Sequence, residues 1–199
     1  MSEKAPARGL IDLYFVDESG FSLVPYVPYA WQEAGETITL PSHGGKRLNV
    51  LGFMSARPGT DNDLVAYTVE GSIDGDTLIA CMNAFVESRQ QPTVVVLDNS
   101  PVHRSGKVEA MLPLWQEQGV GVFFLPRYAP HLNPIEILWR KMKYEWMPLG
   151  AYASWACLVE AVEAMLCQCG SSARDAAEAP NMTTSSVLPR NSIKAKPSS

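Results

Sequence analysis

The stretch Val94-Val95-Val96-Leu97-Asp98-Asn99 decides the fold of this chain. Four apolar residues, three of them β-branched, follow one another without polar interruption, as in a strand buried on both faces of a sheet. Two polar residues come next, with no turn-forming spacer between. The stretch therefore predicts a central strand that ends in a carboxylate.

Helix and strand patterns alternate after this strand. Residues 105–118 have helical spacing, although Pro113 should kink or shorten that helix. Residues 120–125 predict a second buried strand, and residues 133–147 and 155–169 predict two more helices. This alternation is typical of parallel strands joined by helices.

Strand patterns dominate the chain before it. The expected strands are residues 11–16 and 21–27 around a turn at Ser19-Gly20, a β-rich segment at 31–40, and residues 47–56 and 64–69. A helix should follow, because apolar residues recur at helical spacing after Asp76, the expected N-cap.

This order of elements predicts an α/β protein with the plan of the ribonuclease H-like fold. A central mixed sheet, made of an antiparallel three-strand meander plus parallel strands, should be flanked by helices. We expect a leader at residues 1–10, one catalytic domain at residues 11–170, and a mostly disordered tail at residues 171–199, where large apolar side chains are few.

Composition narrows the class of protein. The 199 residues carry a net charge of −5, which counts against a strongly basic nucleic-acid binder. The longest apolar stretch, residues 151–166, contains Glu160 and Glu163 and is too short for a membrane span. The first nine residues lack the apolar region of a secretion signal, and the four cysteines form no CxxC pair. We expect buried reduced thiols and a cytoplasmic protein without membrane contact.

Three acidic residues stand where predicted elements end or begin. Asp17 ends the apolar run at residues 13–16, Asp98 ends the central strand, and Glu136 opens the helix after Pro134-Ile135. Mg²⁺ prefers oxygen ligands, and two such ions about 4 Å apart can serve both oxygens of a phosphoryl displacement. The pattern therefore favours a nuclease or polynucleotidyl transferase.

Each acid also has a structural interpretation. Asp17 precedes Ser19-Gly20 and could be a turn residue. Glu18 is a rival ligand, although strand alternation puts it on the opposite face from Asp17. Asp98 could form an ion pair or a cap. His103 could orient a ligand, touch a phosphate or be an ordinary surface residue.

Glu136 has the sharpest structural alternative. With Asn133 as N-cap and Pro134 at the first helical position, it completes a capping box, and it stands four residues before Arg140, as in an ion pair. The same helix carries a charged stripe of Glu136, Arg140 and Lys143. An apolar stripe for the core lies beside it, made of Ile135, Leu138, Trp139, Met142 and Trp146.

Two segments resemble the catalytic core of DDE-type transposases, in the bacterial insertion-sequence branch related to mariner elements. Residues 97–105 follow the family pattern L-D-N-x-x-x-H, and residues 125–139 follow L-P-x-Y-S-P-x-L-N-P-I-E-x-x-W, with Ala129 in place of the serine. Residues 17–21 resemble its first block, D-E-[ST]-x-F. The resemblance covers roughly residues 11–150.

The resemblance implies roles for single residues. Asp17, Asp98 and Glu136 would be the catalytic acids and would hold two Mg²⁺ or Mn²⁺ ions. The remaining candidates are Asn99 and His103, which would orient these ligands, and Arg140 and Lys143, which would contact the DNA backbone.

The function implied is that of a metal-dependent transposase domain, which cleaves DNA strands and transfers them in transposition, recombination and integration. Its partners would be the element ends and target DNA, and its active form a homo-oligomer associated with the nucleoid. Relatives carry helix-turn-helix segments before the core, and this chain begins just before the first catalytic strand. It could be a truncated element, an excised domain, or one product of a split reading frame that works with a separate DNA-binding chain. The alternatives are a catalytically silent remnant or partner-dependent subunit, and a ribonuclease H-like nuclease.

Overall fold

The computed structural model describes residues 11–25, 45–57, 64–126, 132–171 and 193–194. The strands are β1 (Asp12–Ser22), β2 (Arg47–Ser55), β3 (Leu64–Glu70), β4 (Thr93–Leu97), β5 (Val120–Phe124) and β6 (Ile193–Lys194). The helices are α1 (Gly75–Glu87), α2 (Gly106–Glu117), α3 (Ile135–Lys141), the π-helical turn η2 (Met142–Trp146), the 3₁₀ turn η3 (Leu149–Ala153) and α4 (Trp155–Ser171).

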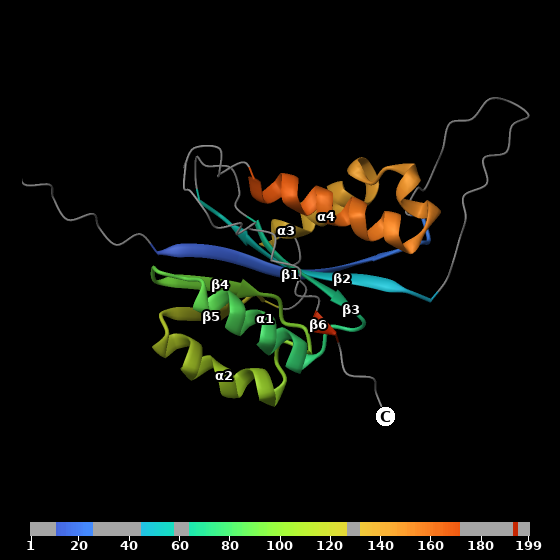
Figure 1. The fold of residues 1–199 in the computed structure, drawn as a ribbon. Coiled ribbons are helices and arrows are strands. Elements are labelled where there is room, and N and C mark those ends of the chain that lie inside the picture. Colours follow the sequence, from blue (N-terminus) through green and yellow to red (C-terminus); the bar gives the residue numbers. More distant parts are fainter. Residues whose placement is uncertain (1–10, 26–44, 58–63, 127–131, 172–192, 195–199) are drawn as a thin grey trace, which may run out of the picture.

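A mixed sheet separates two layers of helices. The strand order is β5-β4-β1-β2-β3-β6, with α1 and α2 on one face and α3 and α4 on the other (Figure 1). Strands β1, β2 and β3 form an antiparallel meander, and β4 and β5 run parallel to β1. The predicted fold class is confirmed.

The predicted turn at Ser19-Gly20 is wrong. β1 is one strand, and it pairs with β2 without a break from Tyr14 opposite Ser55 to Ser22 opposite Arg47. β2 supplies a partner for every residue of β1 from Tyr14 to Ser22, so the local preference of Ser19-Gly20 for a turn does not prevail. The predicted β-rich segment at residues 31–40 lies outside the described residues.

Two helix predictions need correction. The N-cap of α1 is Asp74, whose side chain accepts from the Thr77 N–H at 2.8 Å, and Asp76 lies inside the helix. α2 continues through Pro113, because the buried side chains of Val108 and Trp115 anchor it on both sides of the proline.

The helix predicted at residues 133–147 begins two residues later and changes its winding. Seven residues of α3 lead directly into the π-helical turn η2. Four members of the predicted apolar stripe pack into the core, but the fifth, Trp146, is 44% exposed. A π-helical turn rotates the residues after it relative to an α-helix, so an α-helical count misplaces this residue.

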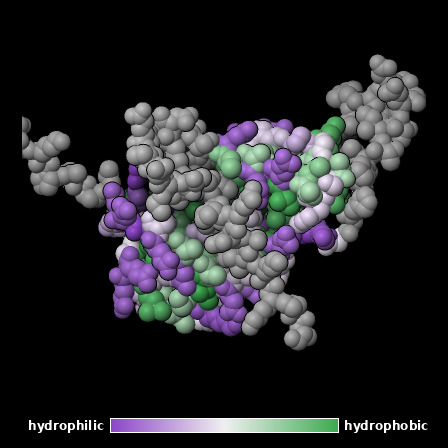
Figure 2. Space-filling view, viewed as in Figure 1, coloured by the Kyte–Doolittle hydropathy of each residue, from purple (hydrophilic) through white to green (hydrophobic). Residues whose placement is uncertain are grey.

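Each face of the sheet has its own apolar core. One core packs α1 and α2 against the sheet around Val16, Phe53 and Phe85. The other packs α3 and α4 around Phe21, Trp139 and Leu158. On the face shown in Figure 2, hydrophilic side chains are spread over both helical layers, between smaller hydrophobic patches.

Among the described helices, none combines the length and apolarity that a membrane crossing requires. The four cysteines are free, and Cys81 is buried as expected. Cys167 is exposed, so the expectation of a buried thiol is wrong there.

Candidate functional site

The sheet brings Asp17 and Asp98 next to each other. β1 and β4 pair in parallel up to Phe15 opposite Val96, and continuing this register by two residues sets Asp17 level with Asp98. Neighbouring strands lie about 4.8 Å apart. β4 ends just before Asp98, whereas Asp17 lies in the middle of β1, opposite Gly52 of β2. Asp17 is therefore not a turn residue at the end of a strand.

A buried hydrogen bond attaches the start of α3 to β1. Asn133 is 2% exposed, and its side-chain Nδ2 donates to the Val16 carbonyl at 3.1 Å. It makes no capping hydrogen bond to α3, so the predicted capping box is wrong. The tether fixes Glu136, three residues later, beside the strand that carries Asp17.

Gly52 allows α3 to lie directly on the sheet. An added Cβ at Gly52 would come within 2.6 Å of the Trp139 ring and 3.0 Å of Ile135. A side chain at this position would therefore push α3, and Glu136 with it, away from Asp17.

The three predicted acids interact electrostatically. Burial raises the pKa of Asp17 to about 7, and the neighbouring carboxylates of Glu18, Glu136 and Asp98 add to the rise. Burial and the charge of Asp98 also raise the pKa of Glu136. Close carboxylates disfavour one another's ionisation, so the part of these shifts that comes from the neighbouring acids shows that the three carboxylates lie near one another.

Asp98 is held by a buried histidine. His103 is fully buried, and its Nδ1 lies 2.5 Å from Asp98 Oδ1, which also accepts from the Ser100 N–H at 3.0 Å. The hydrogen bond from His103 holds the pKa of Asp98 below its usual range. Among the described residues, no hydrogen bond involves Asp98 Oδ2, so that oxygen can serve another ligand.

Glu18 contacts the other nitrogen of the same histidine. Its Oε2 lies 3.2 Å from His103 Nε2, an ion-pair contact without the alignment of a hydrogen bond. Burial opposes a charge on the imidazole, but its contacts with Asp98 and Glu18 outweigh this and raise the pKa of His103 to about 9. A charged imidazole thus links β1 to the segment after β4. His103 is therefore not the ordinary surface residue that the sequence left as one alternative.

Sequence reasoning missed Glu18 in this role, as well as Gly52 and the tether from Asn133. The contact of Glu18 could have been predicted from its position next to Asp17. Strand alternation places the Glu18 side chain on the opposite face from Asp17, where a histidine after β4 can contact it.

Asn99 attaches the segment after β4 to the segment after β5. Its Nδ2 donates to the Leu125 carbonyl at 3.1 Å, and the Leu125 N–H donates to the Leu97 carbonyl at 2.8 Å. The two bonds join the segment after β5 to the residue on each side of Asp98, so they limit how far Asp98 can move.

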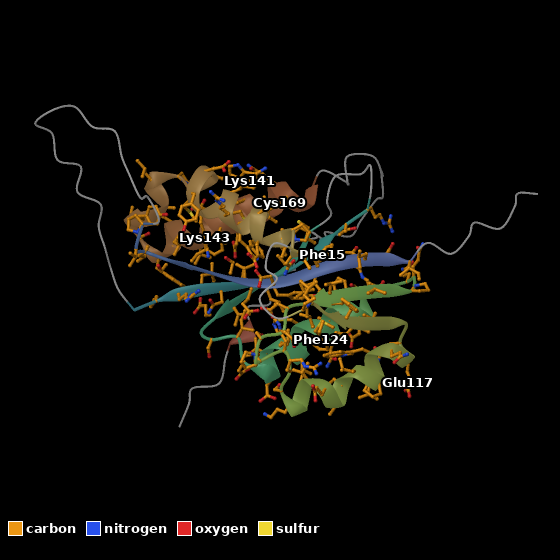
Figure 3. All side chains as sticks on the ribbon, turned by 180° about the vertical axis from the view of Figure 1, so that it is seen from behind. Phe15, Glu117, Phe124, Lys141, Lys143 and Cys169 are labelled. Carbon is orange, nitrogen blue, oxygen red and sulfur yellow. The ribbon has the colours of Figure 1, made fainter. Side chains whose placement is uncertain are left out.

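Basic side chains share a cavity of about 350 Å³ with two of the acids. Its lining comprises Asp17, Glu18, Ser19, Glu136, Trp139, Arg140, Lys143 and Tyr144. Figure 3 shows Lys143 nearer the sheet than Lys141, in the layer of α3 and η2. No ion pair within 4.0 Å joins the described side chains of Glu136 and Arg140, so that predicted pair is wrong.

The donor set fits a hard divalent cation. All three acids offer carboxylate oxygens, and a cation would offset the burial and the neighbouring negative charges that raise the pKa of Asp17. In the described part of the chain, no three His, Cys, Asp or Glu side chains form a ready metal cage. Mg²⁺ does not require one, because it is usually held by one or two carboxylates, water and substrate phosphate.

A family model and solved structures match the chain. The model described as DDE superfamily endonuclease matches residues 12–155. No curated protein matches the chain.

Three solved structures share the fold. The Mos1 mariner paired end complex with Mn has a TM-score of 0.53 at 16% identity, over 78% of this chain and 48% of that one. The Mos1 strand transfer complex has a TM-score of 0.51 at 11% identity, over 85% of this chain and 56% of that one. The third structure is the simian T-cell lymphotropic virus intasome in complex with a PP2A regulatory subunit. It has a TM-score of 0.50 at 10% identity, over 96% of this chain and 63% of that one. The chain thus spans about half the length of the Mos1 chains.

Proposed function

This chain belongs to the DDE superfamily endonuclease family, and on that premise we propose that it cleaves DNA strands and transfers them during transposition. Asp17, Asp98 and Glu136 are its catalytic acids and the ligands of its divalent cations. The observation that carries the proposal is that the pairing of β1 with β4 sets Asp17 level with Asp98, while the bond from Asn133 to β1 holds the start of α3, with Glu136, beside the same strand.

The reaction is an in-line displacement at phosphorus, which depends on positioning and on neutralising charge. Two Mg²⁺ or Mn²⁺ ions bound by these acids would activate the attacking oxygen and stabilise the leaving one. The side chains of the protein itself set the geometry. His103 and Asn99 fix Asp98, and the tether from Asn133 fixes α3 and therefore Glu136.

Arg140 and Lys143 contact the DNA backbone in this proposal. Both line the cavity that holds Asp17 and Glu136, and phosphate oxygens are the usual partners of such side chains. They would hold a phosphodiester beside the acids despite the negative net charge of the chain.

The partners we propose are the ends of a mobile element and a target DNA, bound by an oligomer of this chain. The support is that the matched Mos1 structures are described as a paired end complex and a strand transfer complex.

Nicking of supercoiled plasmid tests the chemistry. Asp17→Asn, Asp98→Asn and Glu136→Gln should each lose activity in Mg²⁺ and in Mn²⁺, while Glu117→Gln, an exposed acid on α2, should keep it. Far-UV circular dichroism checks that each variant is folded. Nicking above a few per cent of the unaltered chain in all three variants would contradict the assignment.

The same assay addresses the rival functions. An RNA–DNA hybrid cleaved in preference to duplex DNA would indicate a ribonuclease H-like nuclease. No nicking by the unaltered chain, even when it is fused to a DNA-binding module, would indicate a silent remnant.

A further inference from the structure

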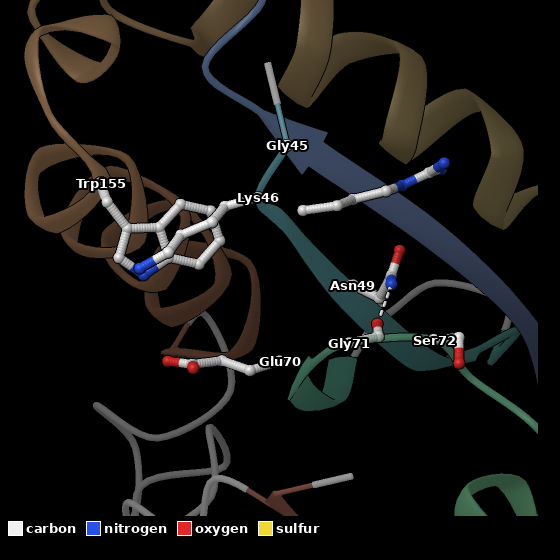
Figure 4. A pocket seen from close by; sticks show the side chains of 8 residues that line it. Gly45, Lys46, Asn49, Glu70, Gly71, Ser72 and Trp155 are labelled. Atoms are coloured by element: carbon white, nitrogen blue, oxygen red, sulfur yellow. Dashed lines mark hydrogen bonds between the residues drawn. The ribbon is translucent and has the colours of Figure 1, made fainter. Parts of the chain in front are cut away.

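A second pocket lies at the edge of the helical layer, away from the acids. It has a volume of about 590 Å³ and is lined by Gly45, Lys46, Arg47, Asn49, Glu70, Gly71, Ser72 and Trp155. Figure 4 shows the Trp155 indole with the Lys46 side chain against it, and Asn49 and Ser72 farther along the pocket. The Lys46 ammonium lies 5.6 Å from the indole centroid.

Two basic side chains lie along β1 between this pocket and the acids. Arg47 lies against Gly20 of β1, where an added Cβ would collide with its guanidinium. The Lys143 ammonium lies over the Phe21 ring. Burial and the charge of Arg47 lower the pKa of Lys143, and the charge of Asp17 opposes this, so Lys143 interacts electrostatically with both residues. Gly20 and Phe21 are consecutive residues of β1, so Arg47 and Lys143 lie on opposite faces of the strand, and Lys143 is on the face of Asp17.

The distance suits a short length of nucleic acid. Asp17 and Ser22, which pairs with Arg47, are five residues apart on β1. At about 3.3 Å per residue this is about 17 Å, a length that a few nucleotides of a DNA strand span.

The lining of the pocket indicates a base rather than a bare phosphate. Glu70 and Asn49 offer oxygens that accept hydrogen bonds from base edges, and the Glu70 carboxylate would repel a phosphate. A half-buried indole offers a flat face for stacking, which an unpaired base can use and a paired one cannot. Lys46 and Arg47 suit the phosphates on either side.

We propose that this pocket binds one unpaired nucleotide of a DNA strand whose backbone passes Lys143 to reach the acids. The base takes the place of the Lys46 ammonium over the Trp155 indole, and the displaced ammonium contacts an adjacent phosphate. The proposal rests on the proposed function, because it takes the bound strand to be the substrate.

Binding of a fluorescent single-stranded 12-mer to the full chain, measured by anisotropy in EDTA, tests this. Trp155→Leu should weaken binding about 5- to 100-fold, and Trp155→Phe, which keeps a stacking face, much less. Lys46→Gln should reduce the slope of log K against log salt by about 0.7. Phe123→Ala and Lys107→Gln, an exposed aromatic on β5 and an exposed lysine on α2, should bind like the unaltered chain.

A photocrosslink provides a readout that does not depend on the stability of a variant. A 12-mer with 5-iodouracil at single positions should crosslink to Trp155 from one position, and mass spectrometry identifies the residue. No crosslink at Trp155, together with unchanged affinity of Trp155→Leu, would overturn the proposal. So would tighter, Trp155-dependent binding of polyglutamate, because the pocket would then suit an acidic protein.

Failure of the pocket and failure of the catalytic assignment give different results. If Asp98→Asn abolishes nicking while the Trp155 and Lys46 variants bind DNA normally, only the pocket proposal falls. If DNA binding depends on Trp155 while the three acid variants still nick plasmid, only the catalytic assignment falls.

Discussion

Asp17 is a carboxylic acid in a place that opposes its charge. Its pKa of about 7 lies above the ordinary 3.8, so between pH 4 and 7 the folded chain holds a proton that the unfolded chain releases. The free energy of unfolding must therefore fall as the pH rises through this window. Above pH 7 the cost of the buried charge is fully present.

Asp17→Asn removes that cost. In EDTA at pH 8 we expect the variant to be more stable than the unaltered chain by about 2–4 kcal/mol, and the difference should vanish near pH 4. Urea unfolding at several pH values measures it. A variant that is less stable than the unaltered chain at pH 8 would show that ionised Asp17 does not destabilise the fold.

His103 provides the opposite charge. Its pKa of about 9 lies above the ordinary 6.5, so its ion pairs stabilise the fold fully below pH 6.5 and are lost as the pH rises through 9. We expect His103→Asn to cost about 3 kcal/mol at pH 6 and less at pH 9.5. Lys107→Gln, which breaks an exposed ion pair with Asp76, should have no measurable effect. Equal effects of the two variants in urea unfolding would contradict a buried charged link.

At the scale of elements, the contact between α3 and β2 sets the position of Glu136. Gly52→Ala should lower the free energy of unfolding by about 1–3 kcal/mol and reduce nicking, because its Cβ would collide with Trp139. Gly121→Ala on β5 is the matched control, since an added Cβ there meets nothing within 4 Å. Urea unfolding and the plasmid assay measure both variants, and equal behaviour would exclude the close contact.

The hydrogen bond from the Asn133 side chain to the Val16 carbonyl also positions α3. Serine caps a helix about as well as asparagine, so Asn133→Ser should be harmless if the residue were a cap. Because Asn133 instead reaches the Val16 carbonyl, we expect the serine variant to lose about 1–3 kcal/mol. Thermal or urea unfolding decides between the two, and an unchanged stability would restore the capping interpretation.

At the scale of the whole molecule, a cation bound by acids from three elements should stabilise the fold. Mg²⁺ at ten times its dissociation constant adds about 1.4 kcal/mol, or a rise in Tm of about 3–5 °C for a chain of this size. NaCl at the same ionic strength should not reproduce the rise, and Asp98→Asn should abolish it. Differential scanning calorimetry measures it. An equal rise in the variant would place the cation elsewhere.

The sequence by itself determined the order of the elements and singled out Asp17, Asp98 and Glu136 as candidate acids. Unbroken apolar runs predict β4 and β5 because burial on both faces admits no polar residue. The positions of Asp17, Asp98 and Glu136 followed from their places beside such runs and from the family blocks that contain them. These are local patterns, and one sequence is enough to see them.

Only the tertiary structure decided how these pieces meet. Ser19-Gly20 reads as a turn until β2 pairs along all of β1, and Asn133 reads as a cap until the Val16 carbonyl comes within its reach. Glu18 gains its role only when His103 packs on the same face of the sheet. Each of these outcomes depends on a partner far away in the chain, whose hydrogen bond or charge outweighs a local preference of about 1 kcal/mol.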